Sequence, residues 1–240
     1  GDNMGAALGV GARPGDVVVS LGTSGTAFAV STTPTADPSG EVAGFADATG
    51  RFLPLVCTLN AARVLTAAAT MIGTDLDGVT RMAREASPGS GGLVLLPYLD
   101  GERTPNLPEA TGSLIGMTRE SMTPANLARA AIEGMLCGLA DAVDALRAQG
   151  VIPERIVLVG GAAANPAVQD VATTVFDLPL VIPPPGEYVA DGAARQAAWA
   201  VLGGSEPPEW TLAGQVVRDP QPRPGVREAY AAARRQVHGR

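Results

Sequence analysis

The chain has 240 residues, of which 46% are hydrophobic and 17% are charged, and its formal net charge is −7. This composition allows a sizeable buried core and excludes a disordered chain, while the acidic balance argues against nucleic acid as a partner, because phosphate-backbone binding normally needs a basic face. No apolar run reaches the roughly 18 residues of a membrane span, and residues 1–10 do not resemble a secretory signal. We therefore expect a soluble, cytoplasmic protein without a membrane partner.

The residue types exclude several mechanisms. All 17 Lys and Arg positions are arginine, so a Walker A loop, a Schiff base and the strand lysine of protein kinases are excluded. The single histidine, His238, is expected in a mobile, solvated tail, where neither a Ser-His-Asp triad nor a histidine metal site is easily built. Cys57 and Cys137 form no CxxC pair, so neither a disulfide framework nor a zinc site is predicted, and Cys137 is expected to pack in the core.

The first half of the chain is predicted to contain a β-hairpin and two longer helices. Asp16 opens a β-branched run, and a glycine-bounded turn separates it from a second such run, which is typical of a hairpin. Leu76, Val79 and Met82 have helical spacing. The expected elements are a short helix over 2–11, strands over 17–21, 26–31 and 51–56, helices over 60–72 and 76–86, and a short apolar segment over 93–96.

The second half begins with the clearest helix. Thr123 is an N-cap residue, Pro124 occupies the first helical position, and an apolar stripe continues until Gly150 ends the helix. Strands and helices then alternate, which predicts an α/β domain. The expected elements are a strand over 155–159, a helix capped by Asn165 and reaching 176, a strand over 180–182, a helix capped by Asp191 and reaching 202, a Pro-rich surface segment over 205–225, and a closing helix over 227–236.

The turn of the predicted hairpin, Gly22-Thr23-Ser24-Gly25-Thr26, combines two glycines with three hydroxyl side chains. Such a turn can direct backbone N–H groups and hydroxyls at phosphate oxygens without any cation. An ordinary hairpin turn explains the same residues equally well.

A second glycine turn, Gly160-Gly161-Ala162-Ala163-Ala164-Asn165, leads from a buried type of strand into a helix. Glycines allow close backbone approach there, and the positive start of the helix favours a phosphate or nucleotide. The alternative is a plain strand-to-helix turn with Asn165 as its N-cap. A dinucleotide fingerprint at Gly9-Val10-Gly11 fails, because Pro14 stands where the third glycine should fall and no strand precedes the motif.

Asp2 is the only acid before Asp16 and begins the first predicted helix. The simpler interpretation is a helix N-cap. A carboxylate beside a phosphate site could instead accept a proton from an attacking hydroxyl, which is the task of the general base in phosphoryl transfer.

Together these segments resemble the C-terminal domain of the FGGY carbohydrate kinases, up to about Gly204. The strongest element is Gly112-Ser113-Leu114-Ile115-Gly116-Met117 followed by 126–133, which matches the family's spaced C-terminal signature. The stretch 96–105 (LPYLDGERTP) and Gly1-Asp2-Asn3 resemble xylulokinases in particular. The segment before Gly112 departs from the xylulokinase pattern, since it lacks the usual basic residue, so no charged contact is expected there.

The resemblance implies an actin-like (ribonuclease H-like) α/β fold, with a mixed sheet and helices on both faces. It makes Asp2 the catalytic base, with no metal ligand assigned to the chain. It places Gly22, Thr23, Ser24 and Gly112 near the phosphates of ATP, and Gly160, Gly161, Ala162 and Asn165 in the adenosine-binding turn.

The resemblance also implies a function: transfer of the γ-phosphate of MgATP to D-xylulose, giving the 5-phosphate. Residues 1–204 would form the ATP-binding domain, and residues 205–240 a Pro-rich tail and terminal helix on or extending from it. The expected partners are ATP, the sugar, a sugar-binding domain that precedes residue 1, and, as one option, a second copy in a homodimer. A chain that begins at Gly1 without Met is expected to lack that domain and to be inactive alone.

Three alternatives remain at this point. Another kinase of the same family would act on ribulose, gluconate or glycerol. An actin-like or chaperone-like nucleotide switch would phosphorylate no metabolite. A binding module would have no activity of its own.

Overall fold

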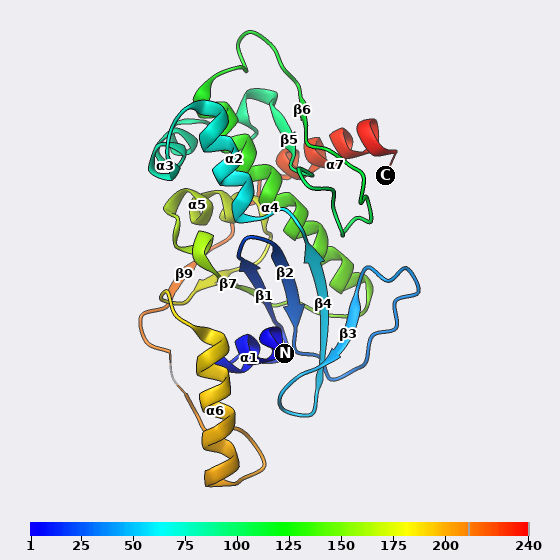
Figure 1. Ribbon diagram of the computed structural model, residues 1–240, viewed down its shortest axis with the longest axis vertical. Helices are drawn as coiled ribbons and strands as arrows, with labels where there is room; N and C mark the ends of the chain where they lie inside the picture. Colours follow the sequence, from blue (N-terminus) through cyan, green and yellow to red (C-terminus); the bar gives the residue numbers. More distant parts are fainter. Residues whose placement is uncertain (211, 240) are drawn as a thin grey trace.

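The computed structural model describes residues 1–210 and 212–239 and shows a mixed seven-stranded sheet covered by helices (Figure 1). The strand order is β3-β4-β2-β1-β7-β8-β9. β1 pairs with β7 and β7 with β8 in parallel, whereas the other neighbours are antiparallel. The strands are β1 Asp16–Leu21, β2 Gly25–Ala29, β3 Ala43–Ala46, β4 Phe52–Thr58, β7 Arg155–Val159, β8 Leu180–Ile182 and β9 Val216–Arg218, with a separate hairpin of β5 Val94–Leu96 and β6 Ser113–Ile115.

The helices cover both faces of this sheet. Alternate side chains of β1 define the two faces: Val17 and Val19 belong to one buried cluster, with α2, α4 and α5, and Val18 belongs to another, with α1 and α6. The sheet is therefore buried on both sides, as expected for an α/β domain. The helices are α1 Asp2–Gly9, α2 Ala62–Ile72, α3 Leu76–Glu85, α4 Pro124–Ala148, α5 Pro166–Val175, α6 Tyr188–Leu202 and α7 Pro224–His238, with 3₁₀ turns η1 Ser90–Gly92 and η2 Gly161–Ala164.

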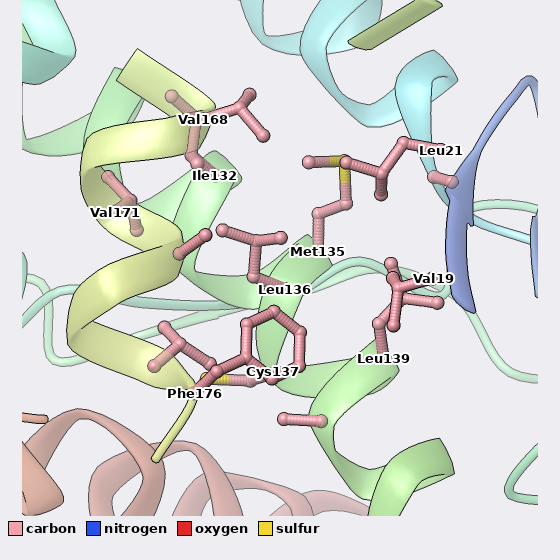
Figure 2. Packing of buried hydrophobic residues seen from close by; sticks show 14 of the residues in the cluster. Val19, Leu21, Ile132, Met135, Leu136, Cys137, Leu139, Val168, Val171 and Phe176 are labelled. Carbon is pink, nitrogen blue, oxygen red and sulfur yellow. The ribbon is translucent and has the colours of Figure 1, made fainter. Parts of the chain in front are cut away.

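Helix α4 is the centre of the larger core. Thr123 caps it by accepting a hydrogen bond from the Asn126 amide, and its apolar side chains are buried between β1 and α5, as Figure 2 shows. Cys137 is fully buried there, which confirms its predicted packing role. Burial also raises the pKa of the Cys137 thiol, so this cysteine is unreactive near neutral pH.

Helices α1 and α6 meet through their backbones. A Cβ atom on Gly9 would overlap the Tyr188 carbonyl oxygen, and one on Gly192 would overlap the Gly5 carbonyl oxygen. Only glycine permits this approach, because backbone atoms cannot move aside as a side chain can. The α1–α6 contact therefore fixes how α1, with Asp2 in its first turn, lies on the sheet.

Replacing Gly192 by alanine should test this contact. In an ordinary helix interior the change stabilises by about 1 kcal/mol. Here we expect a loss of about 1–3 kcal/mol, because the new methyl group overlaps a backbone carbonyl. The free energy of unfolding, measured in urea, gives the sign directly. Gly225→Ala in α7, where a Cβ meets nothing within 4 Å, is the matched control, and equal effects of the two changes would contradict the proposed overlap.

The C-terminal segment joins the same sheet. β9 pairs with β8, and the buried Val226 and Tyr230 of α7 belong to the core around α4. The closing helix is thus confirmed, three residues longer at its start than the predicted 227–236. A domain division at residue 204 stays a prediction.

Three expectations about local structure were wrong. Helix α6 begins at Tyr188, so Asp191 lies inside its first turn and does not cap it. The short strands β3, β6 and β9 were not predicted, and β9 lies within the expected surface segment 205–225. His238 is not in a mobile tail: it lies in the last turn of α7, with its ring centroid 5.3 Å from that of Tyr98. Among the described residues, no helix combines the length and the apolar character that crossing a membrane requires.

Candidate active site

The candidate site lies where two central parallel strands end. β1 ends at Leu21 and its neighbour β7 at Val159, and the two predicted glycine turns follow directly. The carboxyl ends of parallel strands in α/β sheets are the usual place for a ligand crevice. Pairing of β1 with β7 thus brings together two motifs that are about 140 residues apart in the sequence.

A cavity of about 590 Å³ opens at this place. Its walls come from the β1–β2 turn, one side of α2, the start of α3 and the turn after β7. Most of the lining is apolar, with a few convergent polar groups, which is typical of a small-molecule site. The lining residues are Leu21, Gly22, Thr23, Ala62, Arg63, Leu65, Thr66, Ala67, Thr70, Leu76, Gly161, Ala162 and Asn165. The cavity is called the nucleotide cavity below, after the ligand that we propose for it.

The hairpin turn is braced by the start of α2. The carbonyl of Gly22 accepts a hydrogen bond from the Ala62 amide at 2.9 Å, and that of Thr23 accepts one from the Ala61 amide at 3.4 Å. Gly22 and Thr23 line the cavity, whereas Ser24 does not. The predicted hairpin is confirmed, and two residues of its turn line a hollow large enough for a ligand.

The second turn is shaped by Gly160. Its φ is +95°, and a Cβ there would lie 2.7 Å from the Leu21 carbonyl carbon. Glycine therefore lets the turn after β7 pack directly against the end of β1. Gly160 itself does not line the nucleotide cavity, while Gly161 and Ala162 do.

Asn165 has a structural role as well as a place in the cavity wall. Its Oδ1 accepts hydrogen bonds from the amides of Ala167 and Val168 at 2.9 and 3.3 Å, and its Nδ2 donates to the Thr80 hydroxyl at 2.7 Å. The N-cap interpretation is therefore confirmed. One N–H of the side-chain amide is left for a ligand, since an asparagine amide carries two.

Like Ser24 and Gly160, two further predicted site residues lie outside the cavity wall. Gly112 precedes β6, and a Cβ there would meet only the end of the partly exposed Leu99 side chain, at 2.6 Å. Asp2 is exposed in the first turn of α1, and the helix has Gly1 at its N-cap with no side-chain capping bond. The interpretation of Asp2 as a helix cap is wrong, so its carboxylate has no structural task of that kind.

Arg63 was missed by the sequence reasoning. It is the one charged side chain in the described lining of the cavity. Its Nε donates to the Thr23 carbonyl at 3.4 Å and its Nη1 to the Asp100 carboxylate at 2.6 Å. These partners lie 40 and 37 residues away in the sequence, so no local pattern links them to the site.

A buried polar network holds Asp100 in place. Glu102 is 3% exposed, and its carboxylate accepts hydrogen bonds from the Leu59 amide at 2.6 Å and from Nδ2 of Asn60 at 3.0 Å. The same Nδ2 donates to the Gly101 carbonyl at 2.7 Å. The network joins the loop after β5 to the segment that starts α2, and thereby fixes Asp100 beside Arg63.

Within the described residues, no group of three or more His, Cys, Asp or Glu side chains is arranged to hold a metal ion. No metal-binding residue is predicted from the sequence. A metal ion that enters with a bound molecule would be coordinated by oxygen atoms of that molecule.

The sheet order, the two turns and the two-sided helical cover define the actin-like ATPase fold, as structural neighbours show. Residues 17–201 match the model for the FGGY family of carbohydrate kinases, C-terminal domain. The chain belongs to this family, which confirms both the predicted fold and the resemblance.

Among curated relatives, the chain is similar to the xylulose kinase of Streptomyces coelicolor, with 46% identity over 204 residues that cover 85% of this chain and 40% of that protein. Identity to the xylulose kinase of Streptomyces rubiginosus is 44%, covering 86% and 41%. The solved structure of xylulose kinase from Bifidobacterium adolescentis has a TM-score of 0.91 and 47% identity, covering 98% of this chain and 46% of that one. The chain thus spans less than half the length of these relatives.

A more distant neighbour shows the fold alone. Glycerol kinase from Plasmodium falciparum, solved with ADP, has a TM-score of 0.80 at 15% identity and covers 99% of this chain and 50% of that one.

Proposed function

We propose that this chain is the nucleotide-binding half of a sugar kinase that transfers the γ-phosphate of ATP to D-xylulose, giving the 5-phosphate and ADP. The observation that carries the proposal is the nucleotide cavity, where Thr23, Gly161 and Asn165 meet at the ends of β1 and β7. Similarity to the two Streptomyces xylulose kinases supports the choice of sugar. The sugar itself would be held mostly by a domain outside this chain, which closes on the cavity.

We propose that the adenosine lies between α2 and the turn of Gly161 and Asn165. The lining of the cavity is mostly apolar there, which suits the adenine base. The phosphates then extend toward the turn of Gly22 and Thr23. A triphosphate is a strong anion in a chain of net charge −7, so it needs a local cation. Arg63 lies beside Thr23. Its charge is partly compensated by Asp100, but the donors that its bonds to Thr23 and Asp100 leave unused would bind a phosphate oxygen. A Mg²⁺ ion would be bound chiefly by the phosphate oxygens.

In the proposed reaction Asp2 takes the proton of the attacking sugar hydroxyl as the new O–P bond forms. The bond from the γ-phosphorus to the β-phosphate oxygen breaks, and ADP leaves with that electron pair. Because such transition states are loose, positioning and charge stabilisation should account for most of the acceleration. The turn of Gly22, Thr23 and Ser24, together with Arg63, would stabilise the charge on the leaving phosphate.

A calorimetric titration of the chain with MgADP tests the site. We expect weak binding, because half of the cleft is outside the chain, and Arg63→Gln should weaken it by about tenfold or more through the loss of a charge-assisted contact. Arg235→Gln removes the same charge from an exposed position of α7 and should leave binding unchanged. No heat at millimolar MgADP, or equal affinity of the Arg63 variant and the parent, would count against the site.

The second candidate function is that of a kinase of the same family that acts on another sugar. It is favoured by the similarity to the gluconokinase of Bacillus subtilis, which is 30% identical over 209 residues. An assay of ADP release with D-xylulose, ribulose, gluconate and glycerol, on the protein that joins this chain to its sugar-binding domain, separates the two. ADP release that is independent of any sugar would favour a nucleotide switch instead.

A further inference from the structure

A second hollow, called the arginine hollow here, lies at the opposite end of the sheet from the nucleotide cavity. It has a volume of about 670 Å³. Arg155, the first residue of β7, lines it, whereas the residues that follow β7 line the nucleotide cavity. The two sites therefore lie at opposite ends of the central strands. Its charged lining consists of Arg13, Arg51, Arg155, Arg195, Glu206 and Glu209.

Two of the four arginines have carboxylate partners. Arg155 forms a two-pronged pair with Asp16, at 2.5 and 3.0 Å. Arg51 contacts Glu206 at 3.4 Å. These two charges are thus compensated within the protein, and the remaining positive charge of the hollow comes from Arg13 and Arg195.

Arg195 is bonded, but only to neutral acceptors. Its Nε donates to the Pro208 carbonyl at 2.8 Å and its Nη1 to the Leu8 carbonyl at 2.9 Å. These two bonds fix the plane of the guanidinium group, and they leave the two N–H groups of Nη2 available. The Arg13 side chain is exposed and makes no hydrogen bond or ion pair within residues 1–210 and 212–239.

The two side chains repel each other. Burial lowers the pKa of Arg195, and the nearby positive charge of Arg13 lowers it further, while Glu209 acts in the opposite direction. Glu209 lines the hollow but forms no ion pair with either arginine in the described structure. Two guanidinium groups that line one hollow and have unused donors favour a bound anion there, because an arginine fork matches the oxygens of phosphate and carboxylate.

We propose that the arginine hollow binds a small oxyanion, the phosphate or carboxylate group of a metabolite, between Arg13 and Arg195. The site is separate from the proposed kinase reaction and does not depend on it. Through the bond from Arg195 to the Leu8 carbonyl, the anion would lie next to the end of α1, the helix whose first turn contains Asp2.

Calorimetry of the chain with pyrophosphate and with citrate at low ionic strength tests the proposal. Neither MgADP nor free Mg²⁺ is present, because ADP has phosphate groups of its own and Mg²⁺ binds both anions. We expect one site for at least one of the two anions, weakened about tenfold or more by Arg13→Gln, because a charge-assisted contact is lost. Glu209→Gln should tighten binding, since it removes a repelling carboxylate. Arg13→Gln removes no side-chain hydrogen bond or ion pair of the described residues, so its folding should match that of the parent.

The two anions distinguish the source of the oxyanion. Binding of pyrophosphate alone would indicate phosphorylated metabolites, and binding of citrate alone would indicate carboxylates. Arg235→Gln, which lowers the net charge equally, should bind as the parent does. Equal weakening by Arg13→Gln and Arg235→Gln would show general attraction of anions and would overturn the site, as would the absence of binding of both anions. Loss of MgADP binding in Arg63→Gln, with pyrophosphate binding retained, would separate the two sites.

Discussion

Asp2→Asn should lower the turnover of D-xylulose by about 10²–10⁴-fold, because it removes the group that accepts the hydroxyl proton. The assay needs the protein that joins this chain to its sugar-binding domain, with ADP formation as the readout. MgADP affinity should stay within a factor of about two, since Asp2 does not line the nucleotide cavity.

The structure makes this variant easy to interpret. Asp2 is exposed and caps no helix, so the change should leave the free energy of unfolding within about 0.5 kcal/mol of the parent. Asp77→Asn, an exposed first-turn acid of α3, is the matched control and should keep full activity. Near-normal turnover of Asp2→Asn would remove Asp2 as the base, whatever the result for MgADP.

Glu133→Ala should destabilise the fold by about 3–5 kcal/mol, because it leaves a buried arginine without its partner. Glu133 and Arg129 form an ion pair at 2.8 Å in α4, with side chains only 7% and 8% exposed. The Glu133 carboxylate also accepts hydrogen bonds from the Gly89 amide and the Ser90 hydroxyl, both at 2.9 Å. The pair thereby anchors η1, and Arg129 reaches the Ala86 carbonyl just after α3 at 3.1 Å.

Urea unfolding measures this loss against a total stability of about 5–15 kcal/mol for a typical domain. Glu120→Ala breaks an exposed pair with Arg119 and should cost under about 1 kcal/mol. The double variant Arg129→Leu with Glu133→Leu should be more stable than Glu133→Ala, because no charge is left buried. If Glu133→Ala and Glu120→Ala behaved alike, the buried pair would not have this role.

Much of the fold could be predicted from the sequence because its signals are local. The strand 155–159 was predicted with its observed bounds, and Thr123 caps α4 as expected. The strands β3 and β6 could not be predicted, since β3 is largely exposed and owes its conformation to pairing with β4. His238 was misplaced for a similar reason, as its neighbour Tyr98 is far away in the sequence.

The candidate site divides in the same way. The glycine turns could be found by their spacing, and five of the predicted residues, Gly22, Thr23, Gly161, Ala162 and Asn165, line one cavity. Arg63 could not be found, because its relevance depends on α2 lying against the β1–β2 turn. The roles of all these residues toward a nucleotide stay predictions until the titrations are done.

The glycine contact between α1 and α6 has a mechanical consequence. Helix α6 projects from the body of the domain beyond its crossing with α1 (Figure 1). With backbone against backbone at Gly9 and Gly192, no side chain separates the two helices at these two points. A force on the projecting end of α6 would therefore be transmitted to α1 through this crossing. Rotation of α1 would displace the Asp2 carboxylate in its first turn.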